Sequence, residues 1–376
     1  MTLRMGHVLP APIVRHGEEY AIEDRALSGL IAAAEVWDGS IVVVAPEGET
    51  SAAVSVDSTL VSASQLPFEI VMTPLTVEAV EDLNLDVVTA LHSPKMDFVR
   101  HLRTPVVLTS EQTMSIRHGI NRSHLRGISL MRASLGLIRM EKRLRGLLRH
   151  ALSAQFNGPA SMKSYGGLVN EPLVFQDHRV LSRDISAARS VSPWDGSRPL
   201  RLGFSGRLIS IKGPEFAVEL ANRAAEAGLP VELYVFGAGA LENRLRAEAG
   251  DNVYFEGFKN FRTEWLPAVQ EGIDVMVMPH VQGDPSCTYF ESLGSGAPIL
   301  GFDNETLTPL VEEHDIGWTV KKRDVDALLT ELRRIIGDPE VLADTRERGL
   351  NLVADNSFEV TTQRRMDHIQ KAVFSA

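Results

Sequence analysis

Short hydrophobic runs alternate with amphipathic stretches along most of the chain. In the first half, runs rich in Val and Ile have the length of buried strands. They occupy residues 4–9, 41–45, 68–73, 87–91 and 105–109. Apolar residues at helical spacing predict helices over residues 18–37 and 132–154. Such alternation predicts a parallel sheet covered by helices on both faces.

The same alternation restarts after residue 199. Strands are predicted at residues 200–204, 231–236, 253–256, 275–278 and 299–302, the last of which should close the sheet. Helices are predicted at residues 214–227, 241–249, 263–270, 288–294, 324–336, 339–354 and 357–374. Between the two halves, residues 170–199 contain scattered prolines and serines without a sustained period, which is typical of an interdomain connector.

A length of 376 residues suits two α/β domains. We expect a Rossmann-like N-terminal domain at residues 1–175, a linker at 176–198 and a second Rossmann-like domain at 199–355. The last segment, 356–376, should be a helix that packs back toward the N-terminal domain. The predicted fold class is therefore α/β, with two doubly wound domains facing a cleft.

The composition is that of a globular protein, with 44% hydrophobic and 23% charged residues. The single cysteine, Cys287, excludes a disulfide framework and fits a reducing compartment. No signal-like apolar segment opens the chain, and apolar runs such as Ile41–Pro46 are too short to span a bilayer. We expect a cytoplasmic protein.

The net charge of −11 argues against broad nucleic-acid binding, but one stretch is strongly basic. Arg117–His150 contains nine Lys and Arg residues and a single acidic residue, Glu141. Such a stretch can dock on an anionic membrane, here the inner face, or on a lipid-diphosphate acceptor. The alternative is a solvated helix whose apolar stripe lies in the domain core.

Two cations follow the first strand of the second half. The run Gly203–Pro214 places Arg207 and Lys212 between the strand end at Gly206 and the next helix. Ligands of open α/β sheets bind at the carboxyl ends of strands. Arg and Lys there match a diphosphate, although they could also be solvated surface charges.

A second polar stretch follows the strand that begins after Asp274. That strand ends at Pro279, and Ser286, Cys287 and Thr288 then open a helix. The backbone N–H groups at a helix N-terminus form an anion site. Glu291 lies one turn further along and can accept hydrogen bonds from a ribose diol, or else be a capping carboxylate.

Together these runs, with Gly296-Ala297-Pro298, resemble the retaining GT-B glycosyltransferases of family 4 (glycosyl transferases group 1) from about residue 201 to 335. The resemblance implies a GT-B fold with an N-terminal acceptor-binding domain and a C-terminal nucleotide-sugar domain. It implies that Arg207 and Lys212 neutralise the donor diphosphate, that Ser286–Thr288 complete the phosphate cradle, and that Glu291 holds the ribose.

The implied activity is transfer of a sugar from a nucleotide-diphosphate-sugar to a saccharide or lipid-linked acceptor with retention, in exopolysaccharide or cell-envelope synthesis. No metal and no cofactor are expected, because the two cations and the helix N-terminus can neutralise the leaving diphosphate. Gly237, in a glycine-rich loop that departs from a dinucleotide fingerprint, and Phe258 are expected at the nucleobase pocket.

The chain departs from the family at two places. The family has a first glutamate, which touches the transferred sugar, where this chain has Gly283, so Asp284 is the candidate replacement. In the N-terminal half, family members often carry a histidine after the fifth strand, where this chain has residues 109–112, so Glu111 or Gln112 is expected to point into the cleft. His92 and His280, at other strand ends, are candidate contacts for acceptor or sugar, although polar residues often only cap strands.

These departures keep other functions open. A non-catalytic nucleotide-sugar-binding protein would retain the diphosphate site and lack turnover. A GT-B sugar-nucleotide epimerase is a nearer alternative among enzymes, whereas a phosphorylase would need a lysine anchoring pyridoxal phosphate, and none is evident in the sequence.

Overall fold

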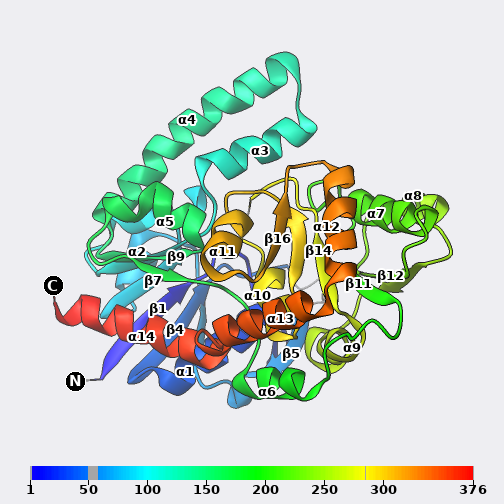
Figure 1. Ribbon diagram of the computed structural model, residues 1–376. Coiled ribbons are helices and arrows are strands. Elements are labelled where there is room, and N and C mark those ends of the chain that lie inside the picture. Colours follow the sequence, from blue (N-terminus) through cyan, green and yellow to red (C-terminus); the bar gives the residue numbers. More distant parts are fainter. Residues whose placement is uncertain (1, 50–57, 284, 376) are drawn as a thin grey trace. The chain divides into compact units, whose positions relative to one another are not determined.

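The computed structural model describes residues 2–49, 58–283 and 285–375, which form two compact units (Figure 1). Unit 1 comprises Met1–Met114, Met131–Phe175 and Glu359–Ala376. Unit 2 comprises Ser115–Leu130 and Gln176–Phe358. Each unit therefore collects segments that are far apart in the sequence.

Unit 1 is built on a parallel seven-stranded sheet with the order β10-β9-β8-β7-β1-β4-β6. Its strands are β1 (Leu3–Val8), β4 (Gly39–Ala45), β6 (Glu69–Met72), β7 (Val87–Leu91), β8 (Val106–Ser110), β9 (Ser153–Asn157) and β10 (Leu173–Phe175). An antiparallel sheet accompanies it, made of β2 (Val14–His16), β3 (Glu19–Glu23) and β5 (Ser58–Ser62).

Helices cover both faces of the large sheet because its strands are apolar on both sides. The helical segments are α1 (Asp24–Val36), α2 (Val77–Glu81), α4 (Gly127–His150, in unit 1 from Met131 on), α5 (Pro159–Tyr165), α14 (Phe358–Phe374, in unit 1 from Glu359 on) and the 3₁₀ segments η1 (Ala63–Gln65), η2 (Pro94–His101) and η3 (Gly166–Leu168). Met366 and Ile369 of α14 lie in the same core cluster as residues of α1. The last helix thus completes one face of unit 1.

Two predictions for this half were wrong in detail. The first residues of the helix expected at 18–37 form strand β3, in which Tyr20 and Ile22 alternate with Glu19, Ala21 and Glu23, and α1 begins only at Asp24. The helix expected at 132–154 ends at His150, and Ser153–Asn157 is a buried central strand. The sequence pattern did not indicate this strand, because Ser153 and Gln155 interrupt the apolar run with polar residues. Both are satisfied by hydrogen bonds, for example 2.8 Å from Gln155 Nε2 to the Arg365 carbonyl.

Unit 2 contains a parallel six-stranded sheet with the order β13-β12-β11-β14-β15-β16. The strands are β11 (Leu200–Ser205), β12 (Val231–Phe236), β13 (Val253–Gly257), β14 (Val275–Met278), β15 (Ile299–Phe302) and β16 (Gly317–Val320). In chain order this is 3-2-1-4-5-6, the doubly wound Rossmann arrangement. The sequence predicted that the strand at 299–302 closes this sheet. In the structure the sheet continues beyond β15, because β16 pairs with it as the edge strand.

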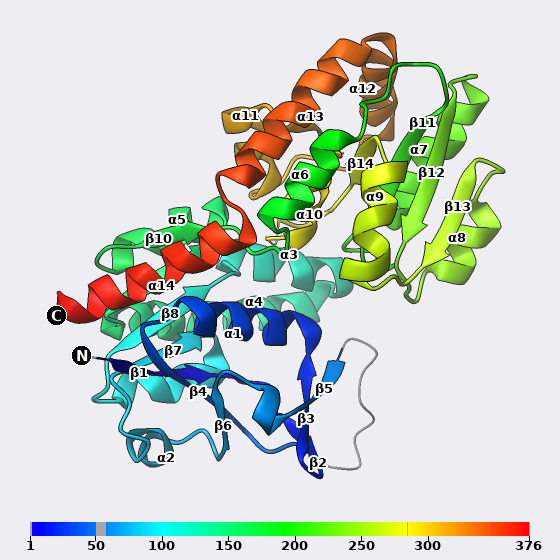
Figure 2. The ribbon, with the colours of Figure 1, turned by 90° about the horizontal axis from the view of Figure 1, so that it is seen from below.

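The helices of unit 2 form a layer on each face of this sheet (Figure 2). They are α6 (Ser182–Ser190), α7 (Pro214–Glu226), α8 (Glu242–Glu248), η4 (Phe261–Trp265), α9 (Leu266–Gly272), α10 (Cys287–Gly294), α11 (Leu307–His314), α12 (Val325–Gly337) and α13 (Pro339–Ala354). Helix α3 (Met114–His124) also belongs to unit 2, from Ser115 on. Helix α6 occupies part of the segment expected to be a linker, and its Ile185 and Ala188 lie in the core.

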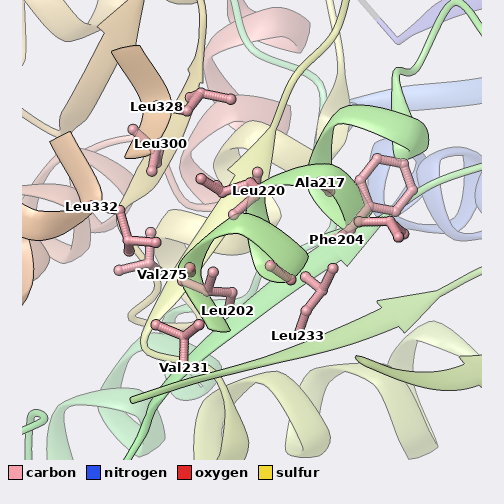
Figure 3. Packing of buried hydrophobic residues seen from close by; sticks show 14 of the residues in the cluster. Leu202, Phe204, Ala217, Leu220, Val231, Leu233, Val275, Leu300, Leu328 and Leu332 are labelled. Atoms are coloured by element: carbon pink, nitrogen blue, oxygen red, sulfur yellow. The ribbon is translucent and has the colours of Figure 1, made fainter. Parts of the chain in front are cut away.

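Alternation of side chains along the strands separates the two cores. Leu202 and Val275 point to the core under α7 and α12, which Figure 3 shows closely packed. Met276 and Met278, offset by one residue along β14, join the core under α9, α10 and α13. No helix in the described ranges is both long enough and apolar enough to cross a membrane.

Candidate functional site

The strand order of unit 2 reverses between β11 and β14, and the expected site residues follow these two strands. Gly206 comes directly after β11, and Pro279 and His280 come directly after β14. A ligand of an open α/β sheet binds in the crevice at such a reversal, outside the carboxyl ends of the strands. The topology therefore gathers the expected diphosphate residues at the edge where a ligand is expected.

Close backbone contacts fix the loop that carries Arg207 and Lys212. The Leu208 N–H donates to the Ala238 carbonyl at 3.0 Å, and the Val281 N–H donates to the Ile211 carbonyl at 3.2 Å. Gly237 has φ +127°, and a Cβ there would overlap the Gly206 carbonyl. Glycine at 237 is needed for this approach as well as for its backbone conformation. The loops after β11, β12 and β14 are thus held as one piece.

The two cations differ in environment. Arg207 is exposed and forms no ion pair or hydrogen bond with any described residue. Lys212 is half-buried, and its charge contributes to lowering the pKa of His280. An exposed guanidinium without a described protein partner, on the same loop as a half-buried ammonium, suits an anionic ligand.

His280 is buried beneath this loop. Burial first, and the Lys212 charge second, lower the pKa of His280 well below its ordinary value, so the ring is neutral at pH 7. Its Nδ1 lies 3.2 Å from the Tyr289 hydroxyl, which also accepts a hydrogen bond of 3.2 Å from Asn304. Its Nε2 is buried without a hydrogen-bond partner among the described residues. This ring nitrogen is available to a ligand group.

Helix α10 begins at the expected anion site. Ser286 precedes it with an extended backbone, and its side chain accepts no hydrogen bond from the first turn. The N–H groups of that turn, which include those of Cys287 and Thr288, therefore receive no cap from Ser286. The contact between His280 and Tyr289 ties this helix to the end of β14.

Glu291 is 4% exposed on α10. Its Oε1 accepts a 3.0 Å hydrogen bond from Arg179, whose guanidinium lies 3.9 Å from the centroid of the Phe261 ring. The other carboxylate oxygen, Oε2, has no hydrogen-bond partner among the described residues. Sequence reasoning missed Arg179, which lies in the segment expected to be a linker and orients the carboxylate.

Asp284, the candidate replacement for the missing glutamate, lies outside the described residues. Its neighbour Gly283 contacts a different carboxylate, because a Cβ at 283 would overlap Oε2 of Glu305 and lie 3.0 Å from the Glu305 backbone nitrogen. The Thr306 hydroxyl donates 2.6 Å to the Gly283 carbonyl, and the Ser115 hydroxyl donates 3.2 Å to Glu305 Oε1. Glu305 follows β15 at its carboxyl end, and the strand-end rule applied to β15 would have found it.

The nucleobase candidates lie on the adjoining side of the same edge. The Gly237 N–H donates 2.7 Å to the Gly257 carbonyl, which joins the loops after β12 and β13. Phe258 follows Gly257 and is 55% exposed. An exposed aromatic ring at this edge offers a stacking surface to a planar base.

The two candidates from the N-terminal half belong to unit 1. His92 is buried, with Nδ1 2.9 Å from Ser110 Oγ and Nε2 3.0 Å from the Leu144 carbonyl. Because both ring nitrogens are engaged in the fold, this environment favours the strand-capping alternative for His92. Glu111 follows β8 at its carboxyl end and is half-buried. Among the described residues of both units, no three His, Cys, Asp or Glu side chains form a metal-binding group.

Comparison with known proteins gives this site a context. Residues 199–338 match the model of a family described as glycosyl transferases group 1. A curated relative, 2-deoxystreptamine glucosyltransferase of Streptomyces kanamyceticus, is 29% identical over 151 residues, which are 39% of this chain and 38% of that enzyme. The match thus spans about two fifths of that relative's length.

Solved glycosyltransferase-fold structures resemble the chain over nearly its whole length. Sucrose-phosphate synthase of Thermosynechococcus elongatus has a TM-score of 0.69 at 14% identity and covers 99% of each chain. Anabaena HepE in complex with UDP has a TM-score of 0.65 at 15% identity, covering 99% of this chain and 100% of HepE. These likenesses confirm the predicted fold class. Residues 199–338 are therefore similar to the glycosyl transferases group 1 family, within a chain whose two Rossmann-like units have the GT-B fold.

Proposed function

We propose that the protein is a metal-independent glycosyltransferase that moves a sugar from a nucleotide-diphosphate-sugar to a hydroxyl acceptor with retention of anomeric configuration. One observation carries this proposal. Arg207, Lys212 and the start of α10 all follow strands β11 and β14, the pair at which the sheet order reverses. The family match of residues 199–338 supports the same reading.

The chemistry requires negative charge to be stabilised on the leaving group. The bond between the anomeric carbon and the diphosphate oxygen breaks, and a bond from the acceptor oxygen to that carbon forms. The acceptor proton passes to the departing diphosphate on the same face of the sugar. Cations that contact the diphosphate stabilise the transition state most where charge develops. Arg207, Lys212 and the α10 amides have this role in the proposal.

Glu291 is proposed to hold the ribose. Arg179 fixes one carboxylate oxygen at 3.0 Å, which leaves Oε2 for the hydroxyl groups of the pentose. The neutral imidazole of His280, with Nε2 unpaired, is proposed to donate or accept a hydrogen bond to a sugar hydroxyl. UDP is the first nucleotide to test, because HepE was solved in complex with it.

Glu305 is proposed to supply the carboxylate that the chain lacks at position 283. Its Oε2 occupies the space beside Gly283, so the carboxylate comes from the loop after β15. Asp284 remains a candidate for this contact, and Glu111 of unit 1 remains a candidate for the acceptor side. Separate Glu305→Gln, Asp284→Asn and Glu111→Gln variants assign the role by their effect on turnover.

Binding and turnover together test the proposal. A thermal-shift screen of UDP, GDP and ADP should raise the melting temperature with at least one of them, because a ligand that binds only the folded state stabilises it. Arg207→Ala and Lys212→Ala should each lower turnover by about 10²- to 10³-fold, the usual effect of removing one transition-state donor. Arg244→Ala, an exposed arginine of α8 that is paired with Glu248, is the matched control.

Turnover also separates the proposal from its alternatives. A non-catalytic binding protein would bind nucleotide and show neither donor hydrolysis nor transfer to any acceptor. An epimerase would convert the nucleotide-sugar without an acceptor. Wild-type rates in both Arg207→Ala and Lys212→Ala would refute the assignment of the diphosphate site.

The basic helix α4 is proposed to dock on an anionic membrane surface, which would bring the enzyme to a lipid-linked acceptor in cell-envelope or exopolysaccharide synthesis. Its apolar residues form two faces, because Leu137, Leu144 and Leu148 are buried whereas four others are exposed. The exposed residues are Ile128, Met131, Leu135 and Ile138, at 55–66% exposure. Their spacing places them on one stripe, with exposed Arg132 and Arg139 beside it.

Liposome co-sedimentation tests this docking. The protein should bind vesicles containing phosphatidylglycerol, less so at high salt, and should not bind neutral phosphatidylcholine vesicles. Leu135→Ser with Ile138→Ser should weaken binding about tenfold or more, because each side chain loses apolar burial in the membrane interface. Val360→Ser, at an exposed apolar position on α14, is the control. Equal binding by all three proteins would contradict the proposal.

A further inference from the structure

A cavity of about 560 Å³ lies within unit 2, beside the loop that carries Lys212. We propose that this cavity binds the phosphate group of a phosphorylated acceptor. That the ligand is an acceptor rests on the proposed function. That the ligand carries a phosphate group rests on the residues of the cavity itself. Its volume lies in the range of small-molecule sites.

The charged residues that line the cavity are all cationic: Arg122, Arg126, Lys322 and Arg323. None of the four forms an ion pair with a described residue, and Arg126 donates only to backbone carbonyls, including that of Leu125 at 2.8 Å. The neighbouring carboxylates have other partners: Asp303 and Asp324 accept the backbone N–H groups of Lys322 and Ala327, and Asp326 pairs with Arg223. An anion is the complementary ligand for such a wall.

Backbone strain marks the same wall. Arg323 has φ +66°, in the left-handed region that non-glycine residues seldom adopt. Such outliers persist where the surroundings impose them, and they concentrate at ligand sites. The strained residue is one of the four cations of the cavity.

A second, independent observation comes from Gln282. This side chain is 6% exposed and lines the cavity, and its Oε1 is buried without a hydrogen-bond partner among the described residues. An unpaired buried acceptor is costly, so a ligand that donates a hydrogen bond would stabilise the site. A fully ionised phosphate ester group cannot donate, whereas a hydroxyl group elsewhere on the phosphorylated molecule can. Gln282 therefore indicates a ligand with both groups, which an acceptor has.

The cavity adjoins the diphosphate loop without sharing its cations. Ile211 and Val281 line it and are joined by a backbone hydrogen bond of 3.2 Å, and they directly precede Lys212 and follow His280 in the sequence. Arg207 and Lys212 are not part of its lining. A donor diphosphate and an acceptor phosphate can thus bind at the same time, on neighbouring residues.

Calorimetric titration of inorganic pyrophosphate tests the site. The titration uses the full chain saturated with the nucleoside diphosphate that most stabilises it, so that the donor loop is occupied. We expect one binding event that weakens about tenfold or more in Arg126→Ala and in Lys322→Ala, the effect of losing one hydrogen bond to a charged group. Lys321→Ala, an exposed lysine next to Lys322 that does not line the cavity, should match the wild type.

Two other ligands separate the possible sources of the phosphate. Glucose 1-phosphate represents a sugar phosphate, and decyl phosphate represents a lipid phosphate that would use the apolar wall of Leu130, Ile211 and Val281. Gln282→Leu should weaken glucose 1-phosphate and leave decyl phosphate unchanged, because only the sugar presents hydroxyl groups to Oε1. The probe that binds more tightly to the wild-type protein indicates whether the acceptor is a sugar phosphate or a lipid phosphate.

The outcomes are distinguishable from those of the proposed function. If no nucleotide binds, the pyrophosphate titration is repeated on the double variant Arg207→Ala/Lys212→Ala. If adding Arg126→Ala to this double variant abolishes pyrophosphate binding, the cavity is an anion site, but its role as an acceptor site is refuted together with the proposed function. Absence of pyrophosphate binding, or equal binding by Arg126→Ala, Lys322→Ala and Lys321→Ala, would overturn the inference. The mutated cationic side chains are all at least partly exposed, Gln282 is buried, and melting temperatures verify that each variant is folded.

Discussion

The contact between Gly283 and Glu305 can be tested by a small steric change. In Gly283→Ala the new Cβ would overlap Glu305 Oε2, which can move, and would lie 3.0 Å from the Glu305 backbone nitrogen, which cannot move as easily. Overpacking of this kind typically costs about 1–3 kcal/mol. Glu305→Ala removes an exposed side chain and its exposed hydrogen bond from Ser115, so alone it should cost less than about 1 kcal/mol.

The double variant decides whether the carboxylate causes the crowding. In Gly283→Ala/Glu305→Ala the Oε2 overlap is gone, so we expect a coupling energy of about 1–2 kcal/mol in favour of the double variant. In differential scanning calorimetry, each kcal/mol should shift the melting temperature by about 2–4 °C. Gly272→Ala is the control, because nothing lies within 4 Å of a Cβ there. Strictly additive changes would refute the argument that Glu305 fills the space beside Gly283.

Three further predictions concern stability. Arg179→Met leaves the carboxylate of Glu291, which is 4% exposed, without its ion-pair partner. The free energy of unfolding, measured by urea denaturation, should fall by about 2 kcal/mol. Adding Glu291→Gln to Arg179→Met should largely restore it, because the unpaired charge is then absent. Burial first, and the Arg365 charge second, lower the pKa of His7 from 6.5 to about 4. The unfolded chain therefore binds the proton more readily, and the free energy of unfolding should fall by up to about 3 kcal/mol as pH drops from 6.5 to 4, with a shallower fall in His7→Gln. Leu202→Ala, at a fully buried position, should cost about 2–5 kcal/mol in the same assay.

The sequence predicted the sheets better than their edges and insertions. Strands such as β4 and β14 are continuous apolar runs, because helices cover both faces, and a period-based reading finds them. Strand β9 was missed because Ser153 and Gln155 are satisfied by partners that are distant in sequence. The small sheet of β2, β3 and β5 was missed because it depends on pairing between strands, which local patterns do not contain.

The site was predictable where residues follow strand ends and less so where partners come from elsewhere. Arg207 and Lys212 lie in the loop after β11, and His280 lies in the loop after β14, so topology alone brings these loops to one edge. Arg179 could not be assigned, because nothing in the local pattern indicates that it pairs with Glu291 across 112 residues. The contact of Glu305 with Gly283 depends on the packing of two loops, and only the structure contains that information.

The discontinuous make-up of unit 1 has a consequence for synthesis on the ribosome. Its core includes Met366 and Ile369, which are made after the whole of unit 2. Domains usually fold in order from the N-terminus as they emerge. The sheet of unit 1 therefore lacks part of its covering layer until α14 leaves the exit tunnel, whereas the residues of unit 2 all precede Glu359, so unit 2 can mature first.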